Sequence, residues 1–210
     1  MVTKSNLLKQ FRIVLCKTSH AGNIGSVARA MKTMGFSDLY LVNPKDFPSD
    51  HANALSCGAE DILQKANVVS SLGAALKDIN HVIGFTARKR ELTQPHKNVR
   101  DLSEQLINEA SDNSIAIIFG NETNGLSNLE LQQCQTLGFI DANLKYSSLN
   151  LAHSVQIVCH EIRMMSNLPI KNNILKKIPK KYVSHQLQNG FYIHLEEILN
   201  EIGFLKKIQA

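Results

Sequence analysis

The chain has 210 residues, enough for one full domain and a short appendage. Its 43% hydrophobic and 20% charged residues are ordinary for a soluble globular protein. No apolar run is long enough to span a membrane, and the polar N-terminus lacks the apolar core of a signal peptide, so we expect a cytoplasmic protein.

The net charge of +5 is spread unevenly along the chain. Residues 170–210 contain seven lysines and three glutamates, whereas the first 169 residues are close to neutral. A neutral domain followed by a basic segment indicates an acidic macromolecular partner such as nucleic acid. A solvated lysine-rich tail explains the charge alone equally well.

The four cysteines indicate no special chemistry. They are far apart, and each lies in or beside an apolar segment, where a free thiol behaves as a small hydrophobic group. No Cys-x-x-Cys or His-x-x-x-His pair occurs. We therefore expect neither a disulfide nor a metal site.

Apolar periodicity predicts an alternation of strands and helices along the chain. The expected strands are at residues 11–16, 39–42, 81–85, 115–119 and 137–140, and the expected helices are at 23–34, 61–79, 101–110, 151–167 and 188–204. Asn23 or Ser26 would cap the first helix, and Gly35 would end it. This alternation predicts an α/β fold with a mostly parallel sheet flanked by helices, in which residues 115–119 form a central strand.

Three loops follow predicted strands and open onto the same edge of the sheet. They span residues 86–90, 120–127 and 146–150. In open α/β sheets, ligands bind at the carboxyl ends of the strands. We therefore expect the functional site at these three loops.

The second of these loops has the glycine spacing of a phosphate-binding P-loop but lacks its lysine. Gly120 and Gly125 match the two glycines and Ser127 the hydroxyl residue, but Leu126 stands where the lysine would reach the phosphates. No Gly-x-Gly-x-x-Gly occurs either. We therefore reject NTP hydrolysis and expect a ligand held by backbone groups. Ser127 and Glu130 instead predict a capping box for a following helix.

Three motifs stand in order at these strand-to-helix junctions. They are Asn23-x-Gly25-x-x-x-Arg29, Phe119-Gly120-x-Glu122-x-x-Gly125-Leu126 and Ser148-Leu149-Asn150-Leu151. Together they resemble the three motifs of the SpoU (SPOUT) RNA 2′-O-ribose methyltransferases. The stretch from Arg12 to about Asn167 is most similar to the TrmJ-type tRNA methyltransferases of that family.

This resemblance implies a deep trefoil knot in the C-terminal half, S-adenosylmethionine bound in the knot, and a homodimer that completes the active site. Periodicity alone predicts an ordinary doubly wound sheet, because knots are almost absent from folds. The implied substrate is tRNA, methylated on the cytidine or uridine ribose at position 32 of the anticodon loop. We expect a methyltransferase domain at 1–167. A basic linker and an amphipathic helix would follow at 168–210, and the helix could pack on the domain, on a partner subunit or on RNA.

Two other functions stay open. The same chemistry could act on another RNA site, such as the tRNA wobble position or rRNA, because the motifs describe the cofactor site and not RNA recognition. A non-catalytic RNA-binding module could keep the fold alone, although Arg29, Glu122 and Asn150 argue against that. TrmJ-type proteins commonly carry a longer basic C-terminal extension than this chain, which leaves tight tRNA binding open.

Five residues match catalytic positions of the family. Arg29 matches its catalytic arginine, and because a guanidinium is a poor base we expect it to clamp a phosphate and stabilise the developing alkoxide. Asn23 would orient Arg29 or the substrate, or act only as a helix cap. Glu122 would hydrogen-bond Arg29 or loop backbone, or lie exposed in its loop. Ser148 and Asn150 would contact the ribose or hold the knot loop, or simply cap a helix.

The resemblance also assigns cofactor contacts to the three loops, mostly through backbone groups. They are Phe85, Thr86, Ala87, Gly120, Ile140, Ser147, Ser148 and Leu149. For Ile140 a plain core role is the competing interpretation. The candidates for binding the RNA backbone, on electrostatic grounds, are Arg88, Lys89, Arg90, Lys176, Lys177, Lys180 and Lys181. A solvated basic face is the alternative for them.

Overall fold

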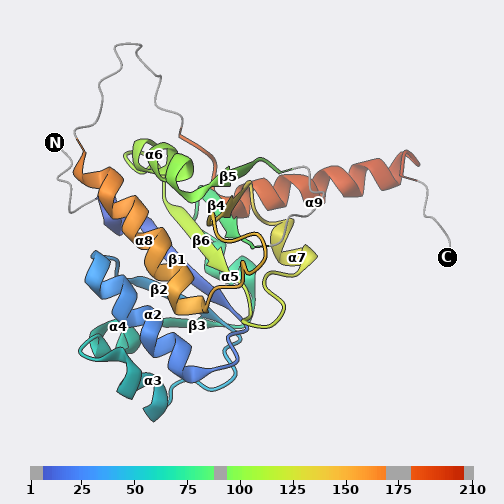
Figure 1. Ribbon diagram of the computed structural model, residues 1–210. Coiled ribbons are helices and arrows are strands. Elements are labelled where there is room, and N and C mark those ends of the chain that lie inside the picture. Colours follow the sequence, from blue (N-terminus) through green and yellow to red (C-terminus); the bar gives the residue numbers. More distant parts are fainter. Residues whose placement is uncertain (1–6, 88–93, 169–180, 206–210) are drawn as a thin grey trace.

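The computed structural model describes residues 7–87, 94–168 and 181–205. Within these ranges seven parallel strands form one sheet in the order β3-β2-β1-β6-β4-β7-β5 (Figure 1). The strands are β1 (Phe11–Cys16), β2 (Asp38–Val42), β3 (Asn67–Val69), β4 (His81–Phe85), β5 (His96–Asn98), β6 (Ile115–Phe119) and β7 (Thr136–Phe139). The expected α/β fold with a parallel sheet is confirmed, and β6 lies at its centre.

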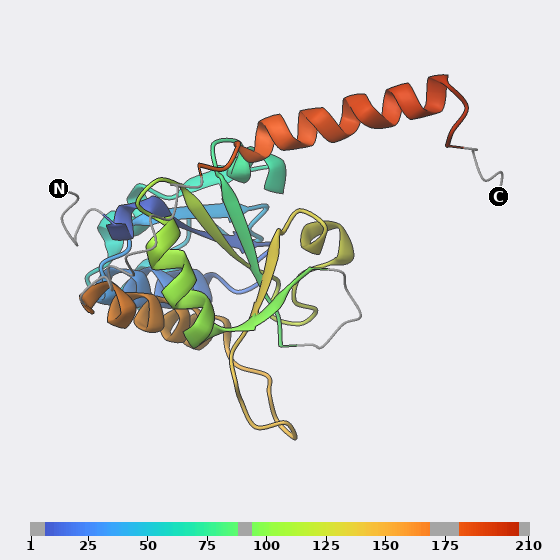
Figure 2. The same ribbon diagram turned by 90° about the horizontal axis from the view of Figure 1, so that it is seen from above.

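Helices cover both faces of this sheet (Figures 1 and 2). One face carries α2 (Ala21–Met34), α3 (Asp50–Ser56), α4 (Glu60–Gln64), α6 (Val99–Glu109) and α8 (Leu151–Asn167). The other face carries α5 (Leu72–Leu76) and α7 (Asn128–Leu131). A short 3-10 turn, η1 (Leu8–Gln10), precedes β1, and α9 (His185–Glu201) is the last helix of the described residues.

The two helical layers explain why β1, β4 and β6 are buried at every position and mostly apolar. Side chains alternate between the faces of a strand. In β1, Ile13 and Leu15 belong to the core beneath α2 and α8, whereas Val14 and Cys16 belong to the core beneath α5. Because both faces are buried, such a strand appears in the sequence as a continuous hydrophobic run.

The order of the connections brings three loops together. After β4 the chain crosses to the sheet edge at β5, and it returns through α6 to β6 on the opposite side of β4. It then passes through α7 to β7, which inserts between β4 and β5. The carboxyl ends of β6, β4 and β7 therefore lie side by side.

Three details of the predicted elements are wrong. Residues 61–79, expected to be mostly helical, hold the end of α4, the strand β3 and the helix α5. The strand β5 and the helix α3 were not expected at all. The helix α2 begins at Ala21, after an extended His20 without a side-chain cap, so Asn23 and Ser26 lie inside the helix. The Asn23 amide bonds to Glu122 and Asn150 and caps no helix.

Of the described C-terminal residues, those at the start of the segment are hydrogen-bonded to the domain. The Tyr182 N–H donates to Asn113 Oδ1 over 2.8 Å, and Asn80 Nδ2 donates to the Tyr182 carbonyl over 2.9 Å. The His185 N–H donates to the Ile79 carbonyl over 2.6 Å. In the first turn of α9, Gln135 Nε2 donates to Gln188 Oε1 over 2.8 Å. Beyond Gln188, α9 projects away from the sheet (Figure 2). Its large exposed apolar side chains are Leu187, Phe191, Tyr192, Ile193, Leu195 and Ile198.

Candidate active site

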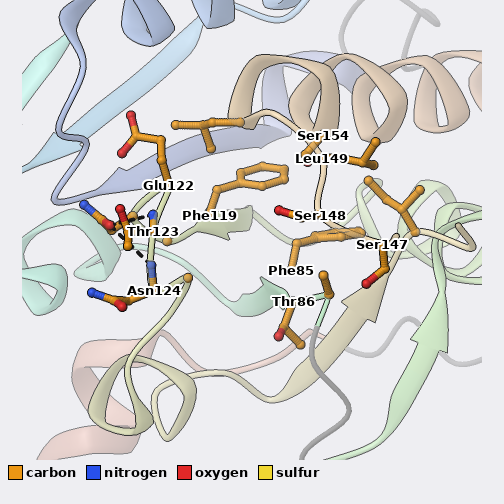
Figure 3. A pocket seen from close by; sticks show the side chains of 16 residues that line it. Phe85, Thr86, Phe119, Glu122, Thr123, Asn124, Ser147, Ser148, Leu149 and Ser154 are labelled. Carbon is orange, nitrogen blue, oxygen red and sulfur yellow. Dashed lines mark hydrogen bonds between the residues drawn. The ribbon is translucent and has the colours of Figure 1, made fainter. Parts of the chain in front are cut away.

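A pocket of about 280 Å³ opens at the carboxyl ends of β4, β6 and β7, against the start of α8 (Figure 3). It lies where the sequence predicted a site. Its wall includes all eight residues that the resemblance assigned to the cofactor, namely Phe85, Thr86, Ala87, Gly120, Ile140, Ser147, Ser148 and Leu149. Glu122 also lines it, and it is the one charged side chain among the sixteen lining residues.

Two stacked aromatic rings form part of the pocket wall. Phe85 and Phe119 end β4 and β6 and pair in register, so their side chains emerge on the same face. Their ring centroids are 5.5 Å apart, with 18° between the ring planes. The Phe85 ring also lies against Gly138, where an added Cβ would come within 2.6 Å of it. The neighbouring strand β7 therefore needs glycine at this position.

The turn after β6 folds back on itself around two glycines. The Gly125 N–H donates to the Asn121 carbonyl over 2.8 Å, and Gly125 has a positive φ of 68°. A Cβ on Gly120 would lie 2.0 Å from the Gly125 carbonyl carbon and 2.1 Å from the Leu126 nitrogen. Because these neighbours are backbone atoms, only glycine fits at position 120 without opening the turn. The helix α7 follows, and its predicted capping box between Ser127 and Glu130 is confirmed.

The Glu122 carboxylate is held by four hydrogen-bond donors from another part of the chain. Its Oε2 accepts from the Ser19 N–H at 2.9 Å and from Ser19 Oγ at 2.8 Å. Its Oε1 accepts from Asn23 Nδ2 at 2.8 Å and from the His20 N–H at 3.3 Å. The loop after β6 is thereby fixed to the loop after β1 and to the first turn of α2.

These contacts keep Glu122 ionised. Partial burial is the largest single influence and raises its pKa, because burial disfavours the charged form. The hydrogen bonds from the Ser19 N–H, the Asn23 amide and the Ser19 hydroxyl act together in the opposite direction. They lower the pKa of Glu122 from 4.5 to about 2. The carboxylate is therefore a fixed negative charge at neutral pH.

Asn150 links the third motif to the first two. As the N-cap of α8, its Oδ1 accepts from the Ala152 and His153 N–H groups. Its Nδ2 donates to Asn23 Oδ1 over 3.0 Å. A continuous chain of hydrogen bonds thus runs from Asn150 through Asn23 to Glu122. The helix capping that was the alternative for Asn150 occurs, and its bond to Asn23 was not expected.

Arg29 stands apart from this network. Its side chain is exposed, and within the described residues the guanidinium makes no hydrogen bond or ion pair. It is absent from the pocket wall of this single chain. The expected contacts of Arg29 with Asn23 and with Glu122 are therefore not found. Glu122 bonds to loop backbone instead, which is the other contact expected of it.

Sequence reasoning missed Ser19 and His20 as part of the site. Ser19 gives two of the four hydrogen bonds to Glu122, and His20 gives a third through its backbone. Backbone donors carry no signature in a sequence, so His20 offered no signal. For Ser19 the signal was its position between a buried strand and the first motif, at the same sheet edge as the other loops.

Most of the candidate RNA-binding residues lie outside the described part of the chain. These are Arg88, Lys89, Arg90, Lys176, Lys177 and Lys180. Lys181 is described and exposed. Among the described residues, no group of three His, Cys, Asp or Glu side chains is placed to hold a metal ion. No helix in those ranges is long and apolar enough to cross a membrane.

Comparison with known protein families identifies the family to which this chain belongs. Residues 10–160, well over half of the chain, match the SpoU rRNA Methylase family. The chain belongs to this family. The three motifs that meet at the pocket are therefore those of a SpoU methylase, and the family implies the trefoil knot expected in the C-terminal half.

Individual SpoU relatives extend the similarity over nearly the whole chain. The tRNA (cytidine/uridine-2'-O-)-methyltransferase TrmJ of Photorhabdus laumondii is 45% identical over 96% of this chain and 83% of its own length. A probable methylase family protein of Haemophilus influenzae is 44% identical, with a TM-score of 0.73 over 95% of this chain and 83% of its own. TrmJ of Z. mobilis is 28% identical, with a TM-score of 0.81 over 94% of this chain and 83% of its own.

Proposed function

We propose that this SpoU protein transfers a methyl group from S-adenosylmethionine to a ribose 2′-hydroxyl of tRNA. The observation that carries the proposal is the hydrogen-bonded chain Asn150–Asn23–Glu122, which joins all three family motifs beside one pocket. The 45% identity to a tRNA (cytidine/uridine-2'-O-)-methyltransferase supports tRNA as the substrate class. We place the target at the cytidine or uridine of position 32, and the enzyme in the cytoplasm with its tRNA.

The pocket suits S-adenosylmethionine in its chemistry. Its wall combines the apolar faces of Phe85, Phe119, Ile140 and Leu149 with a glycine turn and three serines. No lysine or arginine is among the lining residues, in keeping with a ligand that carries no phosphate. When bound, the cofactor supplies an electrophilic methyl group on a sulfonium. The residues that would hold it are the eight of the three loops named above, chiefly through backbone groups.

The hydrogen-bonded chain Asn150–Asn23–Glu122 would orient the substrate ribose beside the pocket. Asn23 is held by Glu122 on one side and by Asn150 on the other, so its amide has a single orientation beside the pocket. Glu122 is ionised and engaged by four donors, which makes it an anchor for the loops and not a proton acceptor. Holding the attacking hydroxyl in line with the methyl group is what such an arrangement supplies.

Arg29 contributes charge from outside the single-chain pocket. Its exposed guanidinium is free of partners within the described residues, so it is available to a phosphate or to the developing alkoxide. Because Arg29 does not line the pocket of its own chain, a homodimer that completes the site fits the arrangement. We therefore propose that two copies act together, as the family implies.

The exposed helix α9 offers a surface for that second copy. Phe191, Leu195, Ile198 and Ile202 follow one another at spacings of four, three and four residues, as in the seam of packed helices. Residues 185–201 carry three glutamates and no lysine or arginine, a charge that opposes contact with RNA. A helix of 17 residues is only marginally stable unless its apolar face is covered. We propose that the second copy covers it, which makes 168–210 an assembly segment as well as a basic linker.

Sedimentation tests this assembly. The unaltered protein should sediment as a dimer, and Leu195→Asp with Ile198→Asp should shift it towards monomer. Gln186→Asp with Asn189→Asp adds the same two charges at exposed polar positions of α9 and should leave the dimer intact. A monomeric unaltered protein at micromolar concentration would contradict the proposal.

Transfer of labelled methyl to tRNA tests the reaction itself. The substrate is total tRNA from cells that lack 2′-O-methylation, and mass spectrometry then maps the modified nucleotide. Label on the ribose of nucleotide 32 is the expected result. Label at the wobble position, or label on rRNA offered in a parallel reaction, would keep the chemistry and change the target. Cofactor binding without transfer to any RNA would favour the non-catalytic module.

Charge alone supports a role in RNA binding for the basic candidates, all of which except Lys181 lie outside the described ranges. We propose that Arg88, Lys89, Arg90 and the lysines at 176–181 contact the tRNA backbone. Each phosphate contact made by a cation steepens the salt dependence of binding, by roughly 0.9 in the log–log slope for a duplex and 0.7 for a single strand. Replacing three of the lysines with glutamine should flatten that slope. An unchanged slope would remove them from the interface.

A further inference from the structure

The loop that leads from β7 to α8 exposes apolar side chains where solvent would ordinarily favour polar ones. Leu144 is 88% exposed and Tyr146 is 80% exposed, with Lys145 between them. In Figure 2 this segment projects below the sheet, on its own between β7 and α8. A tyrosine and a leucine held in solvent beside a lysine indicate a contact surface.

This surface is continuous with the pocket. Ser147, Ser148 and Leu149 follow Tyr146 directly and line the pocket wall, and Leu149 is itself 39% exposed. Adjacent Cα atoms are about 3.8 Å apart, so the Tyr146 backbone lies one residue from that wall. Whatever contacts Tyr146 is therefore at the mouth of the proposed active site.

Hydrogen bonds hold the loop in one turn. The Tyr146 N–H donates to the Asn143 carbonyl over 2.9 Å, which closes a four-residue turn. The Asn143 side chain accepts from the Lys145 N–H over 3.0 Å and fixes the same turn from inside. Tyr146 is thus presented by a closed turn, and the cost of ordering it on binding is reduced.

Tyrosine and lysine together match the chemistry of single-stranded RNA. An exposed aromatic ring stacks on a base of any sequence, and a neighbouring ammonium group pairs with the backbone phosphate. The acidic helix α9 lacks such a cation, and the pocket wall itself contains none. Lys145 lies between the exposed Leu144 and Tyr146, and of these two side chains Tyr146 is the one with a ring that can stack on a base.

We propose that Tyr146 is a stacking platform for a base of the RNA substrate, with Lys145 on the adjacent phosphate. The ring stacks on an unpaired base at the pocket mouth while the neighbouring ribose enters the site. This inference rests on the proposed function, because it deepens the account of the same site by naming how a single-stranded loop is held there.

The chain contains no tryptophan, which permits a direct test. Tyr146→Trp introduces a single fluorescent reporter at the platform. Titration with unmethylated tRNA should quench its emission, saturating at the concentration that saturates tRNA binding measured by filter retention. The matched control is Tyr192→Trp, at an exposed tyrosine on α9, whose emission should not change with tRNA.

Substitutions of Tyr146 distinguish a role in stacking on RNA from a role in the structure of the loop. Tyr146→Ala should weaken tRNA binding by about 5- to 150-fold, the loss expected for one stacked base. Tyr146→Phe keeps the ring and should bind tRNA as the unaltered protein does. Cofactor affinity should be the same in all three, because Tyr146 does not line the pocket. Equal tRNA affinity of the Ala and Phe variants would overturn the proposal.

Two further outcomes would also overturn it. If the emission of the Tyr146→Trp variant changes on dilution without RNA, the loop faces the second copy. If no RNA quenches the emission, the ring does not stack. Methyl transfer measured in the same samples tests the proposed reaction separately from the proposed stacking. Transfer without quenching refutes only the stacking by Tyr146. Quenching without transfer would refute the reaction and keep the platform.

Discussion

Asn23 and Glu122 lie 99 positions apart in the sequence, and the Asn23 side-chain amide donates to the Glu122 carboxylate over 2.8 Å. The same Asn23 accepts through its Oδ1 from Asn150. An amide can do both at once because it carries a donor and an acceptor on one planar group. Asparagine is therefore the side chain that this position requires, and its substitution is the most direct test of the network.

Asn23→Ala should lower the transfer rate by about 100-fold, because a displacement of about 1 Å at the reacting groups has that effect. Cofactor affinity should fall far less, since Asn23 does not line the pocket. Single-turnover transfer and equilibrium cofactor binding measure the two separately. Ser26→Ala, one turn further along α2, is the control and should transfer normally. Similar losses in both variants would point to general damage to the helix.

The Glu122 carboxylate should show its role in the pH dependence of stability. Its pKa is lowered from 4.5 to about 2, so it stabilises the folded state above about pH 4.5 and loses that contribution as pH falls towards 2. Glu122→Gln removes the charge at every pH. After allowance for solvent screening, it should reduce the free energy of unfolding by about 1 kcal/mol at pH 7.

Urea unfolding at several pH values checks this prediction. The difference between the unaltered protein and Glu122→Gln should be constant from pH 7 to 5 and shrink below about pH 4.5. A difference that grows on acidification would have the wrong sign for a carboxylate with a lowered pKa. Glu104→Gln, on the exposed face of α6, is the matched control and should change little at any pH.

The sequence was sufficient to predict the inner strands of the sheet. It was not sufficient to predict the two strands at its edges. β1 and β6 are buried on both faces, so their hydrophobic runs identified them. β3 and β5 have three residues each and lie at the two edges, where exposed positions carry Asn67, His96 and Lys97. What makes them strands is pairing with β2 and with β7, the latter some 40 residues away. Local patterns contain no record of such pairing.

The candidate site shows the same division. Eight of the sixteen residues that line the pocket were assigned to the cofactor through the family resemblance, whose motifs stand where strands end. The hydrogen-bond partners of the site residues could not be predicted from the sequence. Asparagine is a common helix N-cap, so Asn23 was expected to begin the helix. In the structure α2 starts two residues earlier, and the Asn23 amide bonds to Glu122 instead. Such a contact follows from the order of the strands in the sheet, which local periodicity does not specify.

Gly120→Ala should abolish cofactor binding, because the added methyl group would lie about 2 Å from the backbone of Gly125 and Leu126. The turn must open to relieve that overlap, and it forms part of the pocket wall. Isothermal titration with S-adenosylmethionine measures the effect. Gly73→Ala is the matched control, since an added Cβ meets nothing within 4 Å there and a helix favours alanine. Normal binding by the Gly120 variant would show that the turn adapts.

Arg29→Ala should abolish methyl transfer while leaving the fold and cofactor affinity unchanged. The side chain is exposed and makes no hydrogen bond within the described residues, so its removal should alter the free energy of unfolding by less than about 0.5 kcal/mol. Arg100→Ala, another exposed arginine, should transfer normally. Thermal unfolding, cofactor titration and transfer to tRNA separate these effects. Unchanged turnover would refute a catalytic role for Arg29.

The Arg29→Ala variant also tests whether the second copy completes the site. It keeps an intact pocket, whereas Gly120→Ala keeps an intact Arg29 beside a blocked pocket. If Arg29 acts on the pocket of the other copy, mixing the two inactive variants and allowing subunits to exchange should restore part of the activity. If Arg29 acts on its own pocket, every mixed dimer has two defective sites and stays inactive. Transfer to tRNA by the mixture, set against each variant alone, therefore distinguishes a shared site from a self-contained one.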